Sequence, residues 1–321
     1  MTESPSPQPA ALAPKSAGPL RAIVLKVVSV CFFVVMATLL KATETIPAGE
    51  LVFFRCFFAI LPVAAWLLWR RQLRTALHTS DPWGHVLRAL VGVASMGLGF
   101  FALTRLPLPE STAIGYASPL LIVVFSALLL KERVYVFRWT AVVVGLVGVV
   151  VILWPRLTLF TSGQPLGDGE TVGALAALGG AILTAFALMQ VRKLTRTERT
   201  EAIVVYFFIC ASILSLLTIP FGWLMPTPQQ AMLLVGAGFA GGIGQLLMTS
   251  SYRYADMSVI APFEYVSLLL TLIIGFTVFG DLPTWSMVVG ALIIMGSGIA
   301  VILREHHLGL ERSKARQAST P

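Results

Sequence analysis

Long runs of hydrophobic residues alternate with short polar turns along almost the whole chain. The hydrocarbon core of a bilayer is about 30 Å thick, so roughly 17 to 25 apolar residues are enough for a helix to cross it. The runs predict ten transmembrane helices, which are Ala22–Leu40, Leu51–Trp69, Val86–Thr104, Ser111–Leu130, Val136–Trp154, Val172–Val191, Ile203–Phe221, Met232–Ser250, Ser258–Phe279 and Trp285–Leu303. We therefore expect an all-α polytopic membrane protein whose surroundings are the lipid bilayer.

The composition agrees with a membrane location for most of the chain. Of the 321 residues, 57% are hydrophobic and 12% are charged, whereas soluble domains carry about 25% charged residues. Polar groups are therefore too few to cover a water-soluble globule. The formal net charge of +8 does not indicate a nucleic-acid partner, because the basic residues stand in short loops and not on one face between aromatic platforms.

The distribution of Lys and Arg predicts the orientation of the spans, because these residues prefer the cytoplasmic ends of membrane helices. One side of the membrane would hold Lys41, Arg105 and Arg156. The other side would hold Lys15, Arg21, Arg70, Arg71, Arg74, Arg88, Lys131, Arg133, Arg138, Arg192, Lys193, Arg196, Arg199, Arg253, Arg304, Arg312, Lys314 and Arg316. We expect an inner-membrane protein with both termini in the cytoplasm.

Three segments are predicted to lie outside the bilayer. Residues 1–21 are rich in proline and unable to bury surface, so we expect a disordered cytoplasmic tail. Residues 155–171 would form a periplasmic linker, and residues 304–321 a basic cytoplasmic tail that is also disordered. The first apolar run is longer than the core of a secretory signal and lacks a clear cleavage site, so we expect it to be a retained span.

An internal repeat relates the two halves of the chain, residues 22–154 and residues 172–303. Shifting the sequence by 149 residues superposes Tyr116 on Tyr265, Ser118 on Ser267, and Gly92 on Gly241. Five spans per copy is an odd number, so the second copy would enter the membrane upside down. In agreement, the turn Lys131–Arg133 is basic, whereas its counterpart Gly280–Leu282 has no basic residue. Two inverted five-helix repeats are a common plan of secondary transporters, with the substrate site near the midplane.

Several motifs within this plan resemble the EamA-type branch of the drug/metabolite transporter superfamily. They are "FFRCFFA" at 53–59, "LPLPESTAIGYASPL" at 106–120, "LLLKE" before a short turn, and "SVIAPFEYVSLL" at 258–269. The resemblance implies a central cavity between two five-helix halves and alternating access without ATP. The sequences of the fourth and ninth spans are similar to those of members described as S-adenosylmethionine or riboflavin carriers. The motifs recur in carriers of unrelated solutes, so they leave the substrate open.

Glu264 is the main candidate for a functional residue. It would sit about 9 Å inside the ninth span, where a carboxylate facing lipid is unfavourable and an ionisable residue suggests a function. Pro262 and Pro119 each remove a backbone donor and predict a break in the ninth and fourth spans, beside Tyr265 and Tyr116. Broken helices in transporters tend to line cavities. A glutamate that reaches the cytoplasmic surface, and prolines accommodated by plain packing, are the structural alternatives.

Three further polar residues lie inside the apolar runs. Gln245 could bind the solute or hydrogen-bond a neighbouring helix. Lys26 is expected to reach out to the headgroups, as long basic side chains near helix ends usually do. Arg55 is a cavity candidate, although a tether to Glu50 or Glu44 at the external end is the preferred interpretation.

The inventory of reactive groups argues against an enzyme. Nucleophile–base pairs or metal ligands would be needed at a shared depth, and no metal or cofactor site is expected. The histidines, outside every predicted run, are His78, His85, His306 and His307. The cysteines, expected to be packing residues without a disulfide framework, are Cys31, Cys56 and Cys210.

The sequence thus predicts a secondary active transporter for a small organic metabolite. Few buried charges and several aromatic residues favour an amphipathic or partly aromatic solute, and the resemblance implies one similar to S-adenosylmethionine or riboflavin. A multiply charged solute such as a sugar phosphate would call for paired Lys or Arg in the cavity. A lipid flippase or a non-transporting membrane sensor on the same fold is the alternative. A coupling proton and a homodimer are left open.

Overall fold

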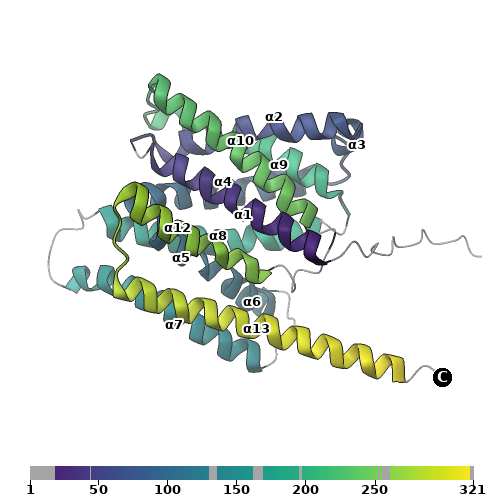
Figure 1. Ribbon diagram of the computed structural model, residues 1–321. Helices are drawn as coiled ribbons and strands as arrows, with labels where there is room; N and C mark the ends of the chain where they lie inside the picture. Colours follow the sequence, from purple (N-terminus) through teal and green to yellow (C-terminus); the bar gives the residue numbers. More distant parts are fainter. Residues whose placement is uncertain are drawn as a thin grey trace, which may run out of the picture.

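The computed structural model describes residues 19–43, 45–129, 136–161, 169–194, 197–251, 254 and 261–318. In this part of the chain the regular elements are all helices (Figure 1). The predicted N-terminal tail up to residue 18, the turn at 130–135 and residues 162–168 of the predicted linker lie outside the described residues.

The helices follow one another in two sets. The first set is α1 (Pro19–Lys41), α2 (Ala48–Trp69), the short α3 (Leu73–Ala76), α4 (Pro82–Arg105), α5 (Leu108–Gly115), α6 (Ala117–Leu129) and α7 (Val136–Thr161). The second set is α8 (Gly169–Leu194), α9 (Thr200–Leu216), η1 (Ile219–Phe221), α10 (Pro228–Ser251), η2 (Ala261–Tyr265), α12 (Val266–Ile274), η3 (Gly275–Phe279) and α13 (Trp285–Ala318). α5 with α6, and η2 with α12 and η3, each make up one broken span.

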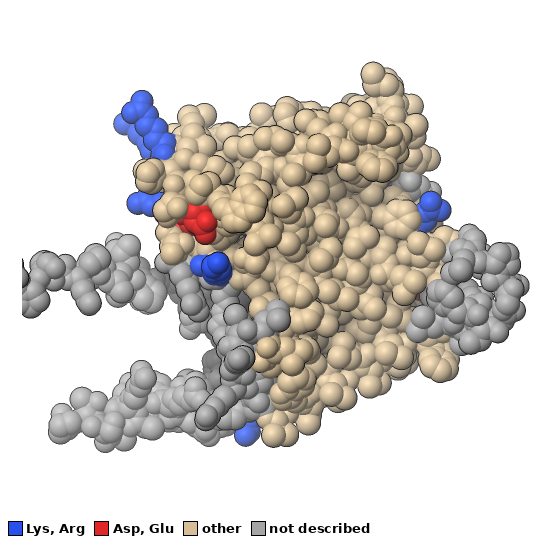
Figure 2. Space-filling model, turned by 180° about the vertical axis from the view of Figure 1, so that it is seen from behind, with Lys and Arg blue, Asp and Glu red and all other residues tan. Residues whose placement is uncertain are grey.

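The ten predicted spans are confirmed as helices. Within the described residues, six helical stretches are long and apolar enough to cross a membrane, and four shorter apolar helices supply the remaining spans. Figure 2 shows one face of the molecule, where a broad band of uncharged residues separates Lys and Arg side chains at its two edges. Such a band is the surface that a lipid environment requires.

Two helices extend beyond their predicted ends. α7 continues through Pro155 to Thr161, into the segment predicted as a linker. α13 continues to Ala318, so the prediction of disorder after Arg304 is wrong for residues 305–318. That segment is rich in Leu, Glu, Lys, Arg and Ala, which are strong helix formers, and helical propensity extends the last span into a long single helix.

The helix contacts follow the inverted repeat. The first helix of each repeat is α1 or α8, and the third span is α4 or α10. α1 packs along α10, and α8 packs along α4, so the same pairing occurs twice with the repeats exchanged. α2 with α9, and α7 with α13, pair equivalent helices of the two repeats. In Figure 1, α7 and α13 lie side by side along one edge of the bundle. The two halves are therefore interleaved around a pseudo-twofold axis.

Candidate functional site

The fourth span breaks at Tyr116. α5 ends at Gly115 and α6 begins at Ala117, with Tyr116 between them as the C-cap of α5. Pro119 stands in the first turn of α6 and has no backbone N–H to offer to the carbonyl of Gly115. The hydroxyl of Ser118 donates to that carbonyl at 2.9 Å instead. The break is thus stabilised by a side chain of the same helix.

The ninth span breaks at the equivalent position. The 3₁₀ turn η2 ends at Tyr265 and α12 begins at Val266, 149 residues after the start of α6. The hydroxyl of Ser267 donates to the carbonyl of Glu264 at 2.9 Å, which repeats the bond made by Ser118 in the first copy. Pro262 lies in η2. It has no backbone N–H to donate to the carbonyl of Ser258, and Ser258 lies outside the described residues.

The two breaks meet each other between the repeats. The ring centroids of Tyr116 and Tyr265 are 5.1 Å apart, with the planes inclined by 49°. The hydroxyl of Tyr116 donates to the carbonyl of Glu264 at 2.8 Å and also contacts the hydroxyl of Ser267. The structure therefore brings together three of the predicted site residues, Glu264, Tyr265 and Tyr116, at one junction.

Lys26 of α1 pairs with Glu264. The ammonium Nζ lies 2.6 Å from the carboxylate Oε1, and the side chains are 2% and 44% exposed, respectively. The prediction that Lys26 reaches the headgroups is therefore wrong, because α1 packs against η2 and presents a carboxylate closer than the membrane surface. The pair joins the first helix of one repeat to the broken span of the other.

Gln245 belongs to α10, the helix that packs along α1. The neighbouring Gly244 accepts a hydrogen bond through its carbonyl from Ser29, at 2.8 Å. Gln245 itself is half-buried in α10. Within the described residues, no hydrogen bond joins its amide to Glu264 or to Tyr116. The structure thus gives Gln245 a partly buried position on α10 and no hydrogen bond to the junction among the described residues.

Arg55 of α2 is buried away from the partners predicted for it. The Glu50 carboxylate accepts from the backbone N–H of Leu224 at 3.0 Å and does not pair with Arg55, so that tether is wrong. Glu44 lies outside the described residues. The Arg55 side chain is 7% exposed, with Nε 3.5 Å from the sulfur of Met36. Arg55 stands five residues after Glu50 in the sequence. Its side chain is directed at the neighbouring helices and not at Glu50.

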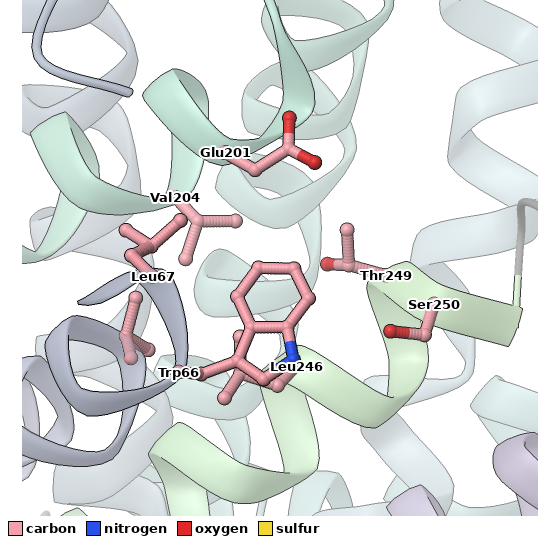
Figure 3. A pocket seen from close by; sticks show the side chains of 8 residues that line it. Trp66, Leu67, Glu201, Val204, Leu246, Thr249 and Ser250 are labelled. Atoms are coloured by element: carbon pink, nitrogen blue, oxygen red, sulfur yellow. The ribbon is translucent and has the colours of Figure 1, made fainter. Parts of the chain in front are cut away.

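A small cavity lies between α2, α9 and α10. Figure 3 shows Trp66, Glu201 and Thr249 among the side chains around it. Its volume is about 20 Å³, which is room for one water molecule. None of the predicted site residues lines it, and it is too small for a metabolite. At the junction of the broken spans the contacts described above join the two repeats.

The burial of His85 and of the Arg88 guanidinium was not indicated by the charge and hydropathy pattern. His85 belongs to the first turn of α4 and is 1% exposed, so it is not a loop residue. Arg88 was assigned to the cytoplasmic charged rim, yet the atoms Nε and Nη1 of its guanidinium are shielded from solvent. The signal that could have placed them is the N-capping Asp81 followed by Pro82, which moves the helix start ahead of the apolar run.

The comparisons with known proteins agree with this architecture. The sequence pattern of the EamA-like transporter family matches residues 20–154 and again residues 171–304. The chain is 30% identical over 225 residues to a riboflavin transporter of Vibrio cholerae, covering 70% of this chain and 72% of that one. It is 27% identical over 258 residues to an S-adenosylmethionine uptake transporter of Rickettsia prowazekii, covering 80% and 83%.

An exporter and a crystal structure extend the likeness to nearly the full length. The pseudopaline exporter CntI of Pseudomonas aeruginosa is 27% identical over 284 residues, covering 87% of this chain and 95% of that one. A protein of known crystal structure superposes with a TM-score of 0.61 at 22% identity, covering 89% of this chain and 98% of that chain, which supports the fold. The chain belongs to the EamA-like transporter family of the drug/metabolite transporter superfamily.

Proposed function

We propose that this protein is a secondary active transporter that moves a small organic metabolite across the inner membrane by alternating access. The inverted repeats, and the two broken spans that meet between them, support this proposal. Equivalent elements that face each other across a pseudo-twofold axis can exchange their roles when one half rocks against the other. Both termini are proposed to be cytoplasmic, from the distribution of Lys and Arg.

The observation that carries the proposal is the ion pair between Lys26 and Glu264. It links the two repeats, and Glu264 remains partly exposed while Lys26 is buried. Separating the halves at this point would break the pair and leave Lys26 without this carboxylate, which is costly for a buried charge. A cationic group of the solute bound to Glu264, or protonation of Glu264, would change the free-energy cost of separating Lys26 from Glu264. The pair is therefore suited to couple opening to solute or proton binding.

The substrate class follows from the surroundings of the pair and from the relatives. Tyr116 and Tyr265 offer aromatic faces next to Glu264, and aromatic faces bind flat or cationic organic groups. Three relatives are named for riboflavin, S-adenosylmethionine and pseudopaline. We propose an amphipathic organic solute that carries an aromatic or cationic part.

The test is flux into proteoliposomes with radiolabelled riboflavin and S-adenosylmethionine as probes. Glu264→Gln should abolish uptake of the transported probe or shift its pH dependence, with normal protein levels in the membrane. Glu201→Gln is the matched control, because Glu201 lines the small cavity and not the junction. Unchanged transport in Glu264→Gln contradicts the role of the pair. Scrambling of labelled lipid without flux of either solute favours a flippase.

The orientation has its own test. In a cysteine-free background, a single cysteine at Leu282 should react with a membrane-impermeant maleimide from the periplasmic side, and one at Gln72 from the cytoplasmic side only. Both positions adjoin helix ends in loops of the two repeats. Labelling of both positions from the same side contradicts the proposed orientation of the two repeats in the membrane.

A further inference from the structure

Two arginine guanidiniums lie among apolar residues in a region separate from the Lys26–Glu264 pair: Arg55 is buried, and Arg88 is partly exposed with Nε and Nη1 shielded from solvent. The guanidinium of Arg55 lies 5.4 Å from the ring centroid of Phe208, and that of Arg88 lies 4.3 Å from the ring centroid of Phe207. The two rings belong to consecutive residues of α9 and contact each other. Arg55 and Arg88 therefore approach the same stretch of α9 from α2 and α4.

Arg88 is directed into the membrane and not toward the nearest surface. It stands six residues after the start of α4, yet its Nη1 lies over Gly92, one turn further in, where an added Cβ would be 2.2 Å from Nη1 and the guanidinium would have to move. Basic side chains near helix ends normally extend to the headgroups. The absence of a side chain at Gly92 provides the space that this inward course requires.

Glycine also provides the space for Arg55. A Cβ built on Gly241 of α10 would lie 3.4 Å from the Nε of Arg55 and closer still to the sulfur of Met36. Gly92 and Gly241 are equivalent residues of the two repeats, 149 positions apart. A glycine of each repeat thus makes room for one of the two arginines, both of which belong to the first repeat.

Neither arginine has a carboxylate partner among the described residues. Arg55 contacts the sulfur atoms of Met36 and Cys56 at 3.5 and 3.8 Å. Arg88 has two guanidinium nitrogens, Nε and Nη1, that are shielded from solvent and have no hydrogen-bond partner. The two positive charges are also close enough to repel each other. Buried charges are normally paired, so stability alone gives no reason to keep both here.

We propose that Arg55 and Arg88 form the binding site for an oxyanion, a carboxylate or a phosphate, of the transported solute. The inference rests on the proposed transport function and deepens it by naming an anionic group of the substrate. A guanidinium presents a planar fork of donors that matches two oxygens of such a group. An anion between them would replace the sulfur and ring contacts and neutralise the mutual repulsion. The rings of Phe207 and Phe208 would hold the adjoining organic part.

This site differs in place and in charge from the junction of the broken spans. Met36, which Arg55 contacts, stands ten residues beyond Lys26 on α1, so the two regions are about 15 Å apart along that helix. It also corrects the expectation that the membrane interior lacks paired basic residues. The sequence placed Arg55 and Arg88 near the N-terminal ends of two spans that start on opposite sides of the membrane, and the packing of α2 and α4 against α9 brings them together.

The test is equilibrium binding to the purified full-length protein in detergent, measured by the ligand dependence of its thermal unfolding midpoint. Two probe pairs differ only in the anion: N-acetylphenylalanine against its amide, and riboflavin 5′-phosphate against riboflavin. The charged member of at least one pair should bind about tenfold more tightly or better, which corresponds to about 1.4 kcal/mol. The preferred pair identifies the source of the oxyanion as carboxylate or phosphate.

Variants assign the preference to the two arginines. Arg55→Gln and Arg88→Gln should each abolish the preference for the charged probe, while the corresponding Lys variants should retain part of it. Arg70→Gln is the matched control, because Arg70 rests on the ring of Trp66 at 5.3 Å but is exposed. Equal binding of charged and neutral probes by the unmodified protein, or a preference that survives both Gln variants, overturns the proposal.

The stability of the ligand-free protein provides a second readout. A cation that serves only the fold should lower the unfolding midpoint when it is removed, whereas an unpaired cation kept for binding should leave it unchanged or raise it. A lower midpoint for Arg88→Gln in the absence of anions therefore contradicts the proposal. Because no flux is measured, the result is independent of whether Glu264 is required for transport.

Discussion

Tyr116 and Tyr265 face each other across the junction of the two repeats, at positions that are 149 residues apart in the sequence. Their rings are in contact with each other, but their hydroxyls have different surroundings. Tyr116 donates to the carbonyl of Glu264, while the hydroxyl of Tyr265 is directed at Gly298 of α13, where a Cβ would find no room. The pseudo-twofold axis therefore relates the helices and the serine bonds at the two breaks, but not the contacts of the tyrosine hydroxyls.

This asymmetry predicts different effects for two otherwise identical substitutions. Tyr116→Phe removes a bond that holds the carbonyl of Glu264, so it should destabilise the protein by about 0.5–1.5 kcal/mol. Tyr265→Phe removes no hydrogen bond that the described residues show, and its effect should be smaller. Thermal unfolding of the two variants in one detergent measures the difference. Equal destabilisation would show that the hydroxyl bond of Tyr116 is not needed.

The Lys26–Glu264 pair should behave as one energetic unit. Lys26→Met and Glu264→Gln are each expected to be destabilising, while the double variant should lose less than the sum of the two. Because Glu264 is 44% exposed, we expect solvent screening to limit the coupling to about 1 kcal/mol. A double-mutant cycle on the thermal unfolding midpoint measures it. Additive effects would show that the contact does not bind the two repeats together.

The fold was predictable because it depends on local patterns. Apolar runs of sufficient length indicate helices in a membrane, and an odd number of spans in each repeat requires inversion. The ends of α7 and α13 were not predicted by the length of the apolar runs, because α7 continues through Pro155 to Thr161 and α13 continues into polar sequence after Arg304. Helical propensity, and not hydrophobicity, favours the extension of α13.

The partners of the buried charges were not predictable from the sequence. Lys26 and Arg88 each stand near a helix end, where a long side chain can reach either the headgroups or a neighbouring helix. Which of these occurs depends on tertiary neighbours, namely Glu264 for Lys26 and the space over Gly92 for Arg88. Glu264 is 238 residues from Lys26, whereas Gly92 is four residues from Arg88 on the same helix and the ring that Arg88 contacts, Phe207, belongs to α9.

The crossing of α7 and α13 requires glycine at one point. A Cβ on Gly148 would lie 2.7 Å from the carbonyl oxygen of Gly290, and one on Gly290 would meet the backbone of Gly148 and the side chain of Ile152. Gly290→Ala should therefore separate the helices and destabilise the protein by about 1–3 kcal/mol. Gly296→Ala on the same helix meets no atom within 4 Å and is the control. We expect thermal unfolding to distinguish them, and equal midpoints would show that the helices can shift without loss.

The carboxylate of Glu198, in the loop between α8 and α9, binds the residues just before α4, outside the membrane-spanning segments. Oε1 of Glu198 accepts hydrogen bonds from the backbone N–H groups of Ser80 and Asp81, at 2.7 and 3.0 Å, and from the hydroxyls of Thr79 and Ser80, at 3.0 and 2.8 Å. Burial raises the pKa of Glu198, but these donors outweigh it and lower the pKa to about 2 from an ordinary value of 4.5. Glu198 in its ionised form thus holds the residues at the start of α4 in place.

The depressed pKa predicts an acid-sensitive stability. Since the folded protein binds the proton of Glu198 less readily than the unfolded chain, this contribution is fully present above pH 4.5 and is lost as the pH falls toward 2. Glu198→Gln should remove about 1–3 kcal/mol of stability at neutral pH, through weaker hydrogen bonds to Thr79, Ser80 and Asp81. The variant should also lose less stability than the unmodified protein between pH 4.5 and 2. Parallel pH profiles of the two unfolding midpoints would show that the carboxylate is not ionised in the folded protein.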